Sequence, residues 1–352
     1  MFEEFTTNLI SVLLFGSVQG AVFALLALGF SLVYGVGGVL NLAHGGFYLA
    51  CMYTFYWSYK VWEITFTASL IITLIVIVII GELVLILMMK VFEYNFVTSI
   101  IIALVVMLGV SPLLIFFQGT DFLLTASVII TLLVIIIITI ITFYFLIKPL
   151  QDSPIGVLLA TFSLAFFFEQ LVKVLPWSDS KTHWVPAIVE KPIEIFGIAF
   201  SLRYIVAIIG SIILVVTIYI FINKTRIGKS IRAVAQDREA AQLMGINADM
   251  IIMLTLVISG ILAAMATFLY GAGEEVSPAM GWGFLTTSFA IVVLGGLGSI
   301  PGSILGAFLI GYARTFCSYF IGTQFAEIFP IIIIIIMLLF RPQGLLGKKE
   351  VE

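Results

Sequence analysis

Few side chains in this sequence have the types and spacing that enzyme chemistry needs. Its two histidines are His44 and His183 and its two cysteines are Cys51 and Cys317, and none of the four is spaced to bind a metal or build a disulfide framework. No GxSxG or HExxH string occurs, and all the aspartates lie outside the apolar runs. We therefore expect no catalytic residue, no metal site and no cofactor in this chain.

Polar residues inside apolar segments are the stronger candidates for function. Asn41, His44 and Gly45 follow a glycine-rich break at Gly35 to Gly38. Such breaks persist in membrane helices where they line a cavity or are covered by protein. Two interpretations stay open: close helix packing with Asn41 and His44 bonded to neighbouring backbone, or a path for a substrate.

Two carboxylates, Glu82 and Glu169, also fall within apolar runs. A carboxylate at mid-membrane costs about 2.5–3.5 kcal/mol on insertion scales, so we expect pairing, protonation or a place in the bundle interior. Glu169 lies near the outer end of its run, where it either reaches water or lines the substrate path.

The composition places these residues in a membrane protein. Of the 352 residues, 62% are hydrophobic and 10% charged, and the mean hydropathy is +1.26, far from the balance of a soluble domain. A net charge of −3 without a basic stripe argues against nucleic-acid binding. The chain should therefore fold as an all-α, polytopic bundle in the lipid bilayer, with a single transmembrane domain over residues 1–352.

Apolar runs predict nine to eleven membrane segments, because about 20 apolar residues cross a bilayer as a helix. The runs are Leu9 to Tyr34, Val39 to Trp57, Phe66 to Met89, Phe96 to Phe117, Phe122 to Ile147, Ile155 to Val172, Leu202 to Ile222, Met250 to Tyr270, Phe284 to Leu294, Ile304 to Phe320 and Phe325 to Phe340. The run at Phe284 to Leu294 is too short to cross. Because Gly295 and Gly296 follow it, we expect a broken or re-entrant half-helix there.

The lysines and arginines of the loops predict the orientation. With the loop from Lys224 to Asp249 placed inside, ten of the 16 basic residues lie on the inner side. This arrangement puts the N-terminus outside and the C-terminus in the cytoplasm. No polar stretch is long enough to fold as a soluble domain, so an energy source must be another polypeptide or an ion gradient.

The inner loop at residues 224–249 carries the most information. Helix-forming residues run from Ser230 to Met244, and Gly245 stands where a helix would end. A solvated connector held near anionic lipid and a docking surface for a soluble partner both fit this composition.

The amino-acid sequence of this loop resembles that of a known family. Glu239, Ala240, Ala241 and Gly245 match the E-A-A-three-residues-G pattern of ABC importer permeases, and RAVAQDREAAQLMGI closely resembles the permease subunits of branched-chain amino acid ABC transporters. YGVGGVLNLAHGGFYLA from Tyr34, VVLGGLGSIPGSILGAF from Val292 and the terminal FRPQGLLG look like segments of the same family, so the resemblance covers most of the chain.

The resemblance implies uptake of branched-chain amino acids by alternating access, driven by two cytoplasmic ATP-binding subunits. It implies a sister permease or a second copy of this chain, and an extracytoplasmic substrate-binding protein. Its coupling residues would be Arg232, Asp237, Arg238, Glu239, Ala240, Ala241 and Gly245. The candidate substrate path is Asn41, His44, Gly45, Glu169, Gly295 and Gly296.

Other functions remain as alternatives. An ion-coupled secondary transporter or channel would explain the spans and glycine breaks, but not the loop that matches the importer pattern. Urea and short amides, which related permeases carry, are alternative substrates. An intramembrane enzyme is disfavoured, because no buried aspartate pair or triad can be assembled.

Overall fold

A computed structural model describes residues 2–56, 132, 135–138, 140–150, 153–174, 183–184, 191–271 and 273–347. The chain divides into two compact units, Met1–Tyr53 with Leu132–Glu352, and Thr54–Thr131. All the candidate functional residues lie in the first unit. Of the second unit, only Thr54 to Tyr56 is described, and Glu82 lies outside the described residues.

The first unit is helical, as predicted. Its helices and strands are α1 Phe2–Gly37, α2 His44–Tyr56, the π-helix η2 Phe143–Ile147, α6 Lys148–Leu150, α7 Pro154–Val174, β1 His183–Trp184, β2 Pro192–Ile195, β3 Ile198–Ser201, α8 Leu202–Lys224, α9 Arg226–Gln236, α10 Arg238–Leu243, α11 Ala248–Ala266, the π-helix η3 Thr267–Gly271, β4 Glu275–Val276, α12 Met280–Gly295, α13 Ile300–Phe320 and α14 Thr323–Phe340.

Six helices in the described part of the chain are long and apolar enough to cross a membrane. They are Phe5–Gly37, Ile155–Lys173, Leu202–Lys224, Ala248–Gly271, Ile300–Phe320 and Thr323–Phe340. Each agrees with a predicted run to within a few residues, so the prediction of a polytopic α-helical membrane protein is confirmed. The runs at Phe66 to Met89 and Phe96 to Phe117 lie outside the described residues, so the total of nine to eleven segments stays a prediction.

Two predicted elements differ from the structure, and one feature of the structure was not predicted. The run from Val39 to Trp57 is helical only as α2, from His44, because the backbone from Gly38 to Ala43 turns. The prediction of a single helix from Ser230 to Met244 is wrong. The segment forms two helices, α9 and α10, that meet at Asp237. The short strands were not predicted, and they form two antiparallel pairs, β2 with β3 and β1 with β4.

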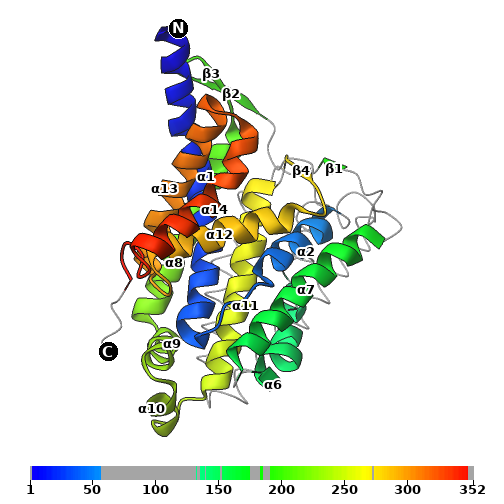
Figure 1. Ribbon diagram of the computed structural model, residues 1–352, viewed down its shortest axis with the longest axis vertical. Helices are drawn as coiled ribbons and strands as arrows, with labels where there is room; N and C mark the ends of the chain where they lie inside the picture. The colour runs from blue at the N-terminus through cyan, green and yellow to red at the C-terminus, as the bar shows by residue number, and fades with distance from the viewer. Residues whose placement is uncertain are drawn as a thin grey trace. The chain divides into compact units, whose positions relative to one another are not determined.

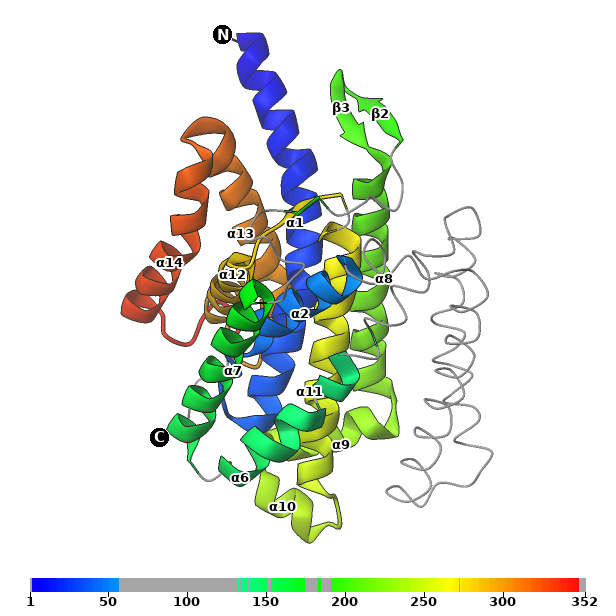
Figure 2. The same cartoon turned by 90° about the vertical axis from the view of Figure 1, so that its right-hand side faces the viewer.

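Helix α1 is the centre of the first unit and contacts α8, α11, α12 and α13. Figure 2 shows it between α13 on one side and α8 and α11 on the other. Most of its middle is fully buried, and Val22, Leu25, Leu26 and Ala27 are each 0% exposed. The N-terminus and the β2–β3 hairpin lie at one end of this unit, and α9 and α10 at the other (Figure 1).

Glycines bring α1 and α13 into close contact. Gly16 and Gly20, spaced as in a GxxxG motif, face Phe308, Gly311 and Tyr312. A Cβ added to Gly20 would lie 2.9 Å from the Cα of Phe308, and one added to Gly311 would lie 2.5 Å from the backbone nitrogen of Gly20. A hydrogen bond of 2.8 Å joins the Ser17 and Tyr312 hydroxyls beside this contact. Small residues are therefore required where these two helices cross.

We predict that Gly311→Val lowers the thermal unfolding temperature of the purified protein in detergent. The added side chain would meet backbone atoms that cannot move aside, and overpacking of this kind typically costs about 1–3 kcal/mol. Gly283→Ala is the matched control, because a Cβ there meets nothing within 4 Å. Equal unfolding temperatures for the two variants would contradict the close packing of α1 on α13.

Candidate functional site

Helix α9 lies against the end of α8. Thr225 caps it by accepting a hydrogen bond of 3.0 Å from the Gly228 backbone N–H. A stripe at helical spacing, Ile227, Ile231 and Val234, is buried. A Cβ on Gly228 would overlap the carbonyl oxygens that end α8, so glycine permits the tight turn between the helices.

Arg232 braces the same turn. Its guanidinium donates a hydrogen bond to the carbonyl oxygen of Ile222 in the last turn of α8. This carbonyl lacks a helical partner, so the bond satisfies a group that the helix end leaves free. Of the predicted coupling residues, Arg232 thus holds the loop to the bundle rather than pointing outward.

Helix α10 is shaped by a residue at each end. Asp237 ends α9 and caps α10, accepting a 2.9 Å hydrogen bond from the Ala240 backbone N–H. Gly245 has a φ of +85°, and the Ile246 and Gly245 N–H groups donate to the carbonyls of Ala241 and Gln242 at 3.0 and 2.9 Å. This is a Schellman motif, so the prediction that Gly245 ends the helix is confirmed.

Ion pairs attach α10 to the rest of the bundle. The Asp249 carboxylate, in the first turn of α11, lies 2.9 Å from the Arg238 guanidinium and 3.3 Å from the Lys148 ammonium of α6. These groups are partly exposed, and pairs of this kind contribute about 0–1 kcal/mol each. Their effect is to fix the position of α10 relative to α6 and α11.

The outer face of α10 forms no such ion pair with the residues that the structure describes. Glu239 and Ala240 are exposed, whereas Ala241 is buried. Leu243 is 89% exposed and Met244 is 83% exposed. Leu243 and Met244 are thus two large apolar side chains exposed at the tip of a polar loop.

A second group of candidates lies at the break between α1 and α2. Asn41 is buried, and its side-chain oxygen accepts a 3.1 Å hydrogen bond from the Ala43 backbone N–H. The Leu42 N–H donates to the Thr161 hydroxyl of α7 at 3.2 Å. The buried His44 ring lies 3.1 Å from the Ser259 hydroxyl of α11 and packs on Phe30. Polar side chains therefore cover the backbone at the start of α2.

Glu169 is paired inside the unit. Its carboxylate is 2.5 Å from the Lys173 ammonium one turn along α7 and accepts a hydrogen bond from the Trp282 indole of α12. Glu169 and Trp282 come from α7 and α12, the two helices that flank α2. Of the alternatives open for this carboxylate, pairing is the one that the structure shows.

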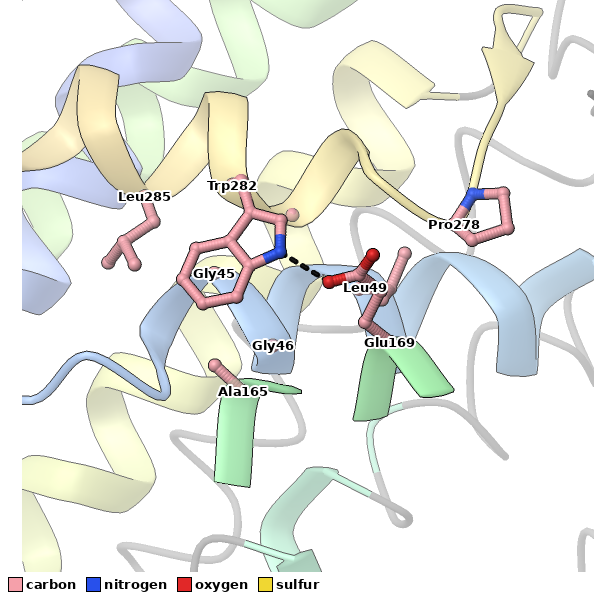
Figure 3. Close-up of a pocket in the computed structure, with 9 residues that line it drawn as sticks. Gly45, Gly46, Leu49, Ala165, Glu169, Pro278, Trp282 and Leu285 are labelled. Atoms are coloured by element: carbon pink, nitrogen blue, oxygen red, sulfur yellow. Dashed lines mark hydrogen bonds between the residues drawn. The ribbon is translucent and has the colours of Figure 1, made fainter. Parts of the chain in front are cut away.

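A narrow cavity of about 10 Å³, roughly the space of one water molecule, lies beside this carboxylate (Figure 3). Gly45, Gly46, Ala165, Glu169 and Trp282 line it together with Leu49, Pro278, Gly281 and Leu285. A Cβ on Gly45 would overlap the Gly281 carbonyl oxygen, so α2 and α12 touch at glycine. The structure thus brings two predicted path residues, Gly45 and Glu169, to one pocket.

Gly295 and Gly296 lie at the other end of α12, away from Trp282. The chain after α14 folds back on them: the Leu345 and Leu346 N–H groups donate to the carbonyls of Leu294 and Gly295 at 2.8 and 2.9 Å. Gly296 has a φ of +105°. The structure therefore does not bring these two glycines into the Glu169 pocket, and it gives them a partner in the C-terminal segment.

A charged cluster lies at the start of α8, at the end of the unit opposite to α10. The Arg203 guanidinium lies 2.9 Å from the Glu274 carboxylate and also donates to the Tyr204 hydroxyl. Burial raises the pKa of Glu274 above its usual range, although the charge of Arg203 opposes that shift.

Several residues of these sites carry no signal in the sequence. Trp282 and Ser259 are ordinary membrane residues until the fold sets them beside Glu169 and His44. Asp249 is recognisable only as an acidic residue at a helix start. Leu243 and Met244 read as part of an apolar helix face, and the structure exposes them instead.

Known proteins resemble this chain over nearly its whole length. The model of the family described as branched-chain amino acid transport system / permease component matches residues 12–115 and 102–340. The high-affinity branched-chain amino acid transport system permease protein BraD of Pseudomonas aeruginosa is 28% identical over 344 residues, 96% of this chain and 95% of that protein. LivH of Escherichia coli, with the same description, is 27% identical over 351 residues, covering 96% and 95%.

One solved structure is also similar, PsaBC from Streptococcus pneumoniae in complex with Fab. It covers 97% of each chain with a TM-score of 0.45 at 14% identity. This likeness is too low to carry an argument.

We predict that Glu169→Ala destabilises the protein more than Glu169→Gln does. Alanine leaves the Trp282 indole N–H without its acceptor in a partly buried position, a loss of up to about 1–3 kcal/mol, whereas glutamine keeps an acceptor oxygen. Thermal unfolding of the two purified variants measures the difference. Unfolding of Glu169→Gln at or below the temperature of Glu169→Ala would show that the hydrogen bond to Trp282 is unimportant.

Proposed function

Because the chain belongs to the family of branched-chain amino acid transport permease components, we propose that it is the membrane-spanning subunit of an importer for these amino acids. The energy comes from ATP hydrolysed by separate subunits. Relatives whose names describe high-affinity branched-chain amino acid transport match 96% of the chain. The spans are joined by loops too short to fold as an ATPase, which fits a subunit that works with a partner motor.

The observation that carries the proposal is the geometry of α10. This helix is exposed on one face and braced on the other through Arg232, Asp249 and the Gly245 turn. A short rigid helix held in this way passes a push from a partner to α8 and α11 as rigid-body motion. In this proposal α10 transmits the motion, and its shape depends on Asp237, Ala240 and Ala241. The ATPase is contacted by Glu239, Leu243 and Met244.

The proposal implies an orientation and a set of partners. The α9–α10 end faces the cytoplasm and the N-terminus lies outside, in keeping with the excess of lysine and arginine at the α9–α10 end. Two ATP-binding subunits dock on a pair of permeases, either two copies of this chain or this chain and a sister. An extracytoplasmic binding protein delivers the substrate at the end that carries the β2–β3 hairpin.

The proposed substrate path runs past Asn41, His44, Gly45 and Glu169. The N-terminus of α2 lies among buried polar side chains, and the positive end of its helix dipole attracts a negatively charged group as the substrate passes. The path reaches the inner side at the break formed by Gly295 and Gly296. The rest of the pocket wall is apolar, as an aliphatic side chain requires.

We predict that the double substitution Leu243→Ser, Met244→Ser lowers the affinity for the ATPase subunit by about tenfold or more. A buried side chain of this size contributes about 1.5–3 kcal/mol, and serine removes most of that contribution from the contact. Binding is measured with the purified permease and its ATPase, and ATP-driven uptake with both in proteoliposomes. Uptake by the double variant should fall while its membrane insertion is unchanged.

Phe196→Ser is the matched control, because Phe196 is also an exposed apolar residue, at 83% exposure, but lies in the β2–β3 turn at the other end. It should leave ATPase binding unchanged. Wild-type binding and uptake by the Leu243, Met244 double variant would refute α10 as the docking element. Uptake by the permease alone under an ion gradient, without ATPase, would favour a secondary transporter.

A further inference from the structure

Arg314 is an arginine within the membrane span of α13, and its charge has no carboxylate partner among the described residues. Its guanidinium donates a 3.0 Å hydrogen bond to the Thr287 hydroxyl of α12 and lies 5.3 Å from the centre of the Phe23 ring of α1. The Nε atom is buried without a hydrogen-bond partner in the described part of the chain. Glu327 of α14 is within electrostatic range but forms no ion pair with it.

A lone cation in this position is costly. On insertion scales an arginine at the centre of a membrane helix costs about 2.5–3.5 kcal/mol, and such residues usually face a bundle interior or a ligand. One hydroxyl and one aromatic face are neutral partners and leave the positive charge uncompensated. The Arg314 side chain contacts Thr287 of α12 and Phe23 of α1, so it points toward these two helices.

The Phe23 ring that Arg314 contacts belongs to a cluster of aromatic rings. Phe284 of α12 is the hub: its ring centre lies 6.2 Å from Phe23, 4.0 Å from Tyr48 of α2 and 6.4 Å from Tyr270 of η3. Tyr270 is within electrostatic range of both Tyr48 and Arg314. The cluster thus joins four elements, α1, α2, α12 and η3, and contacts the charge on α13 through Phe23.

Two further polar groups of this region lack partners among the described residues. They are the Tyr48 hydroxyl and the side-chain oxygen of Gln19, and both atoms are buried. Gln19 lies one helical turn before Phe23 on the same face of α1. Buried polar atoms normally find a hydrogen bond, so three unused groups about one aromatic cluster point to a ligand.

We propose that Arg314 binds the carboxylate of the transported amino acid, with the Phe23–Phe284 cluster receiving its aliphatic side chain. This inference rests on the proposed function and adds the residue that recognises the substrate. The free Nε–H of Arg314 donates to the carboxylate, and the Gln19 oxygen and the aromatic faces accept the ammonium. A donor, an acceptor and an apolar wall match a zwitterion with a hydrocarbon side chain.

The rings fill the space beside Arg314, so binding requires α1, α12 and α13 to part. Alternating access supplies that motion, because it changes which side of the bundle is open. The substrate stabilises the open arrangement by its differential affinity for it. Arg314 lies on a different helix from every residue of the path proposed above.

The test uses the purified permease with its ATPase subunits and measures equilibrium binding of tritiated L-leucine, with L-leucinol as competitor. Leucinol has the same side chain and ammonium but lacks the carboxylate. The wild-type complex should prefer leucine to leucinol. Arg314→Gln should bind leucine about tenfold or more weakly and lose the preference, because it removes a charged hydrogen bond. Arg314→Lys should keep part of the preference, since it keeps the charge.

The control is Glu327→Gln, which alters the nearest charge to Arg314 without touching the site and should bind leucine as wild type does. If Arg314→Gln binds leucine with wild-type affinity and preference, the inference is overturned. If Arg314→Gln does not fold, Tyr48→Phe decides: it removes a hydroxyl without a partner and should weaken leucine binding several-fold, and unchanged binding overturns the inference. Failure of the wild-type permease to associate with the ATPase subunits would instead count against the proposed function.

Discussion

Backbone hydrogen bonding in a medium without water is the constraint from which this architecture follows. Within a span, a helix satisfies every amide internally, but each break leaves N–H and C=O groups that lipid cannot satisfy. The chain breaks its helices at two places in the first unit, before α2 and after α12. At the first break, Asn41 and Thr161 accept from the backbone of Ala43 and Leu42. At the second, the C-terminal segment donates to the carbonyls of Leu294 and Gly295.

The same constraint explains where the glycines stand. Covering a broken backbone requires another element to approach within contact distance, which a Cβ would prevent at Gly45 beside α12 and at Gly296 beside the C-terminal segment. The breaks then place polar groups inside the bundle without exposing them to lipid. His44 and Glu169 are such buried residues beside the first break.

The α9–α10 loop is built by different rules because it lies at the end of the bundle. Here side chains cap the helices, through Thr225, Asp237 and Asn247, and charged groups fix the loop to its neighbours. The α9–α10 loop is therefore held rigidly on the side that faces the bundle and carries apolar side chains at its exposed tip. A membrane bundle that is rearranged by a soluble ATPase needs such a segment, because the membrane-embedded spans present no surface on which a soluble protein can dock.

The sequence predicts those features that depend on local composition. Six spans follow from apolar runs of sufficient length, and the end of α10 follows from one glycine, because both are decided within a few residues. The division of the loop at Asp237 was missed, since helix-forming residues on both sides hide a single capping carboxylate. The pairing of Glu169 with Trp282 joins residues 113 positions apart, and the cover over Gly295 comes from the end of the chain. Such contacts depend on the packed fold, which no local pattern encodes.

The side of the membrane on which α10 lies is the most direct test of this account. Leu243→Cys is labelled with a membrane-impermeant maleimide in right-side-out and in inside-out vesicles, with Phe196→Cys as the residue for the opposite end. The native cysteines Cys51 and Cys317 are both buried, so the background reaction is low. The account predicts that Leu243→Cys reacts only in inside-out vesicles and is protected when the ATPase is added. Reaction of Leu243→Cys in right-side-out vesicles would contradict it.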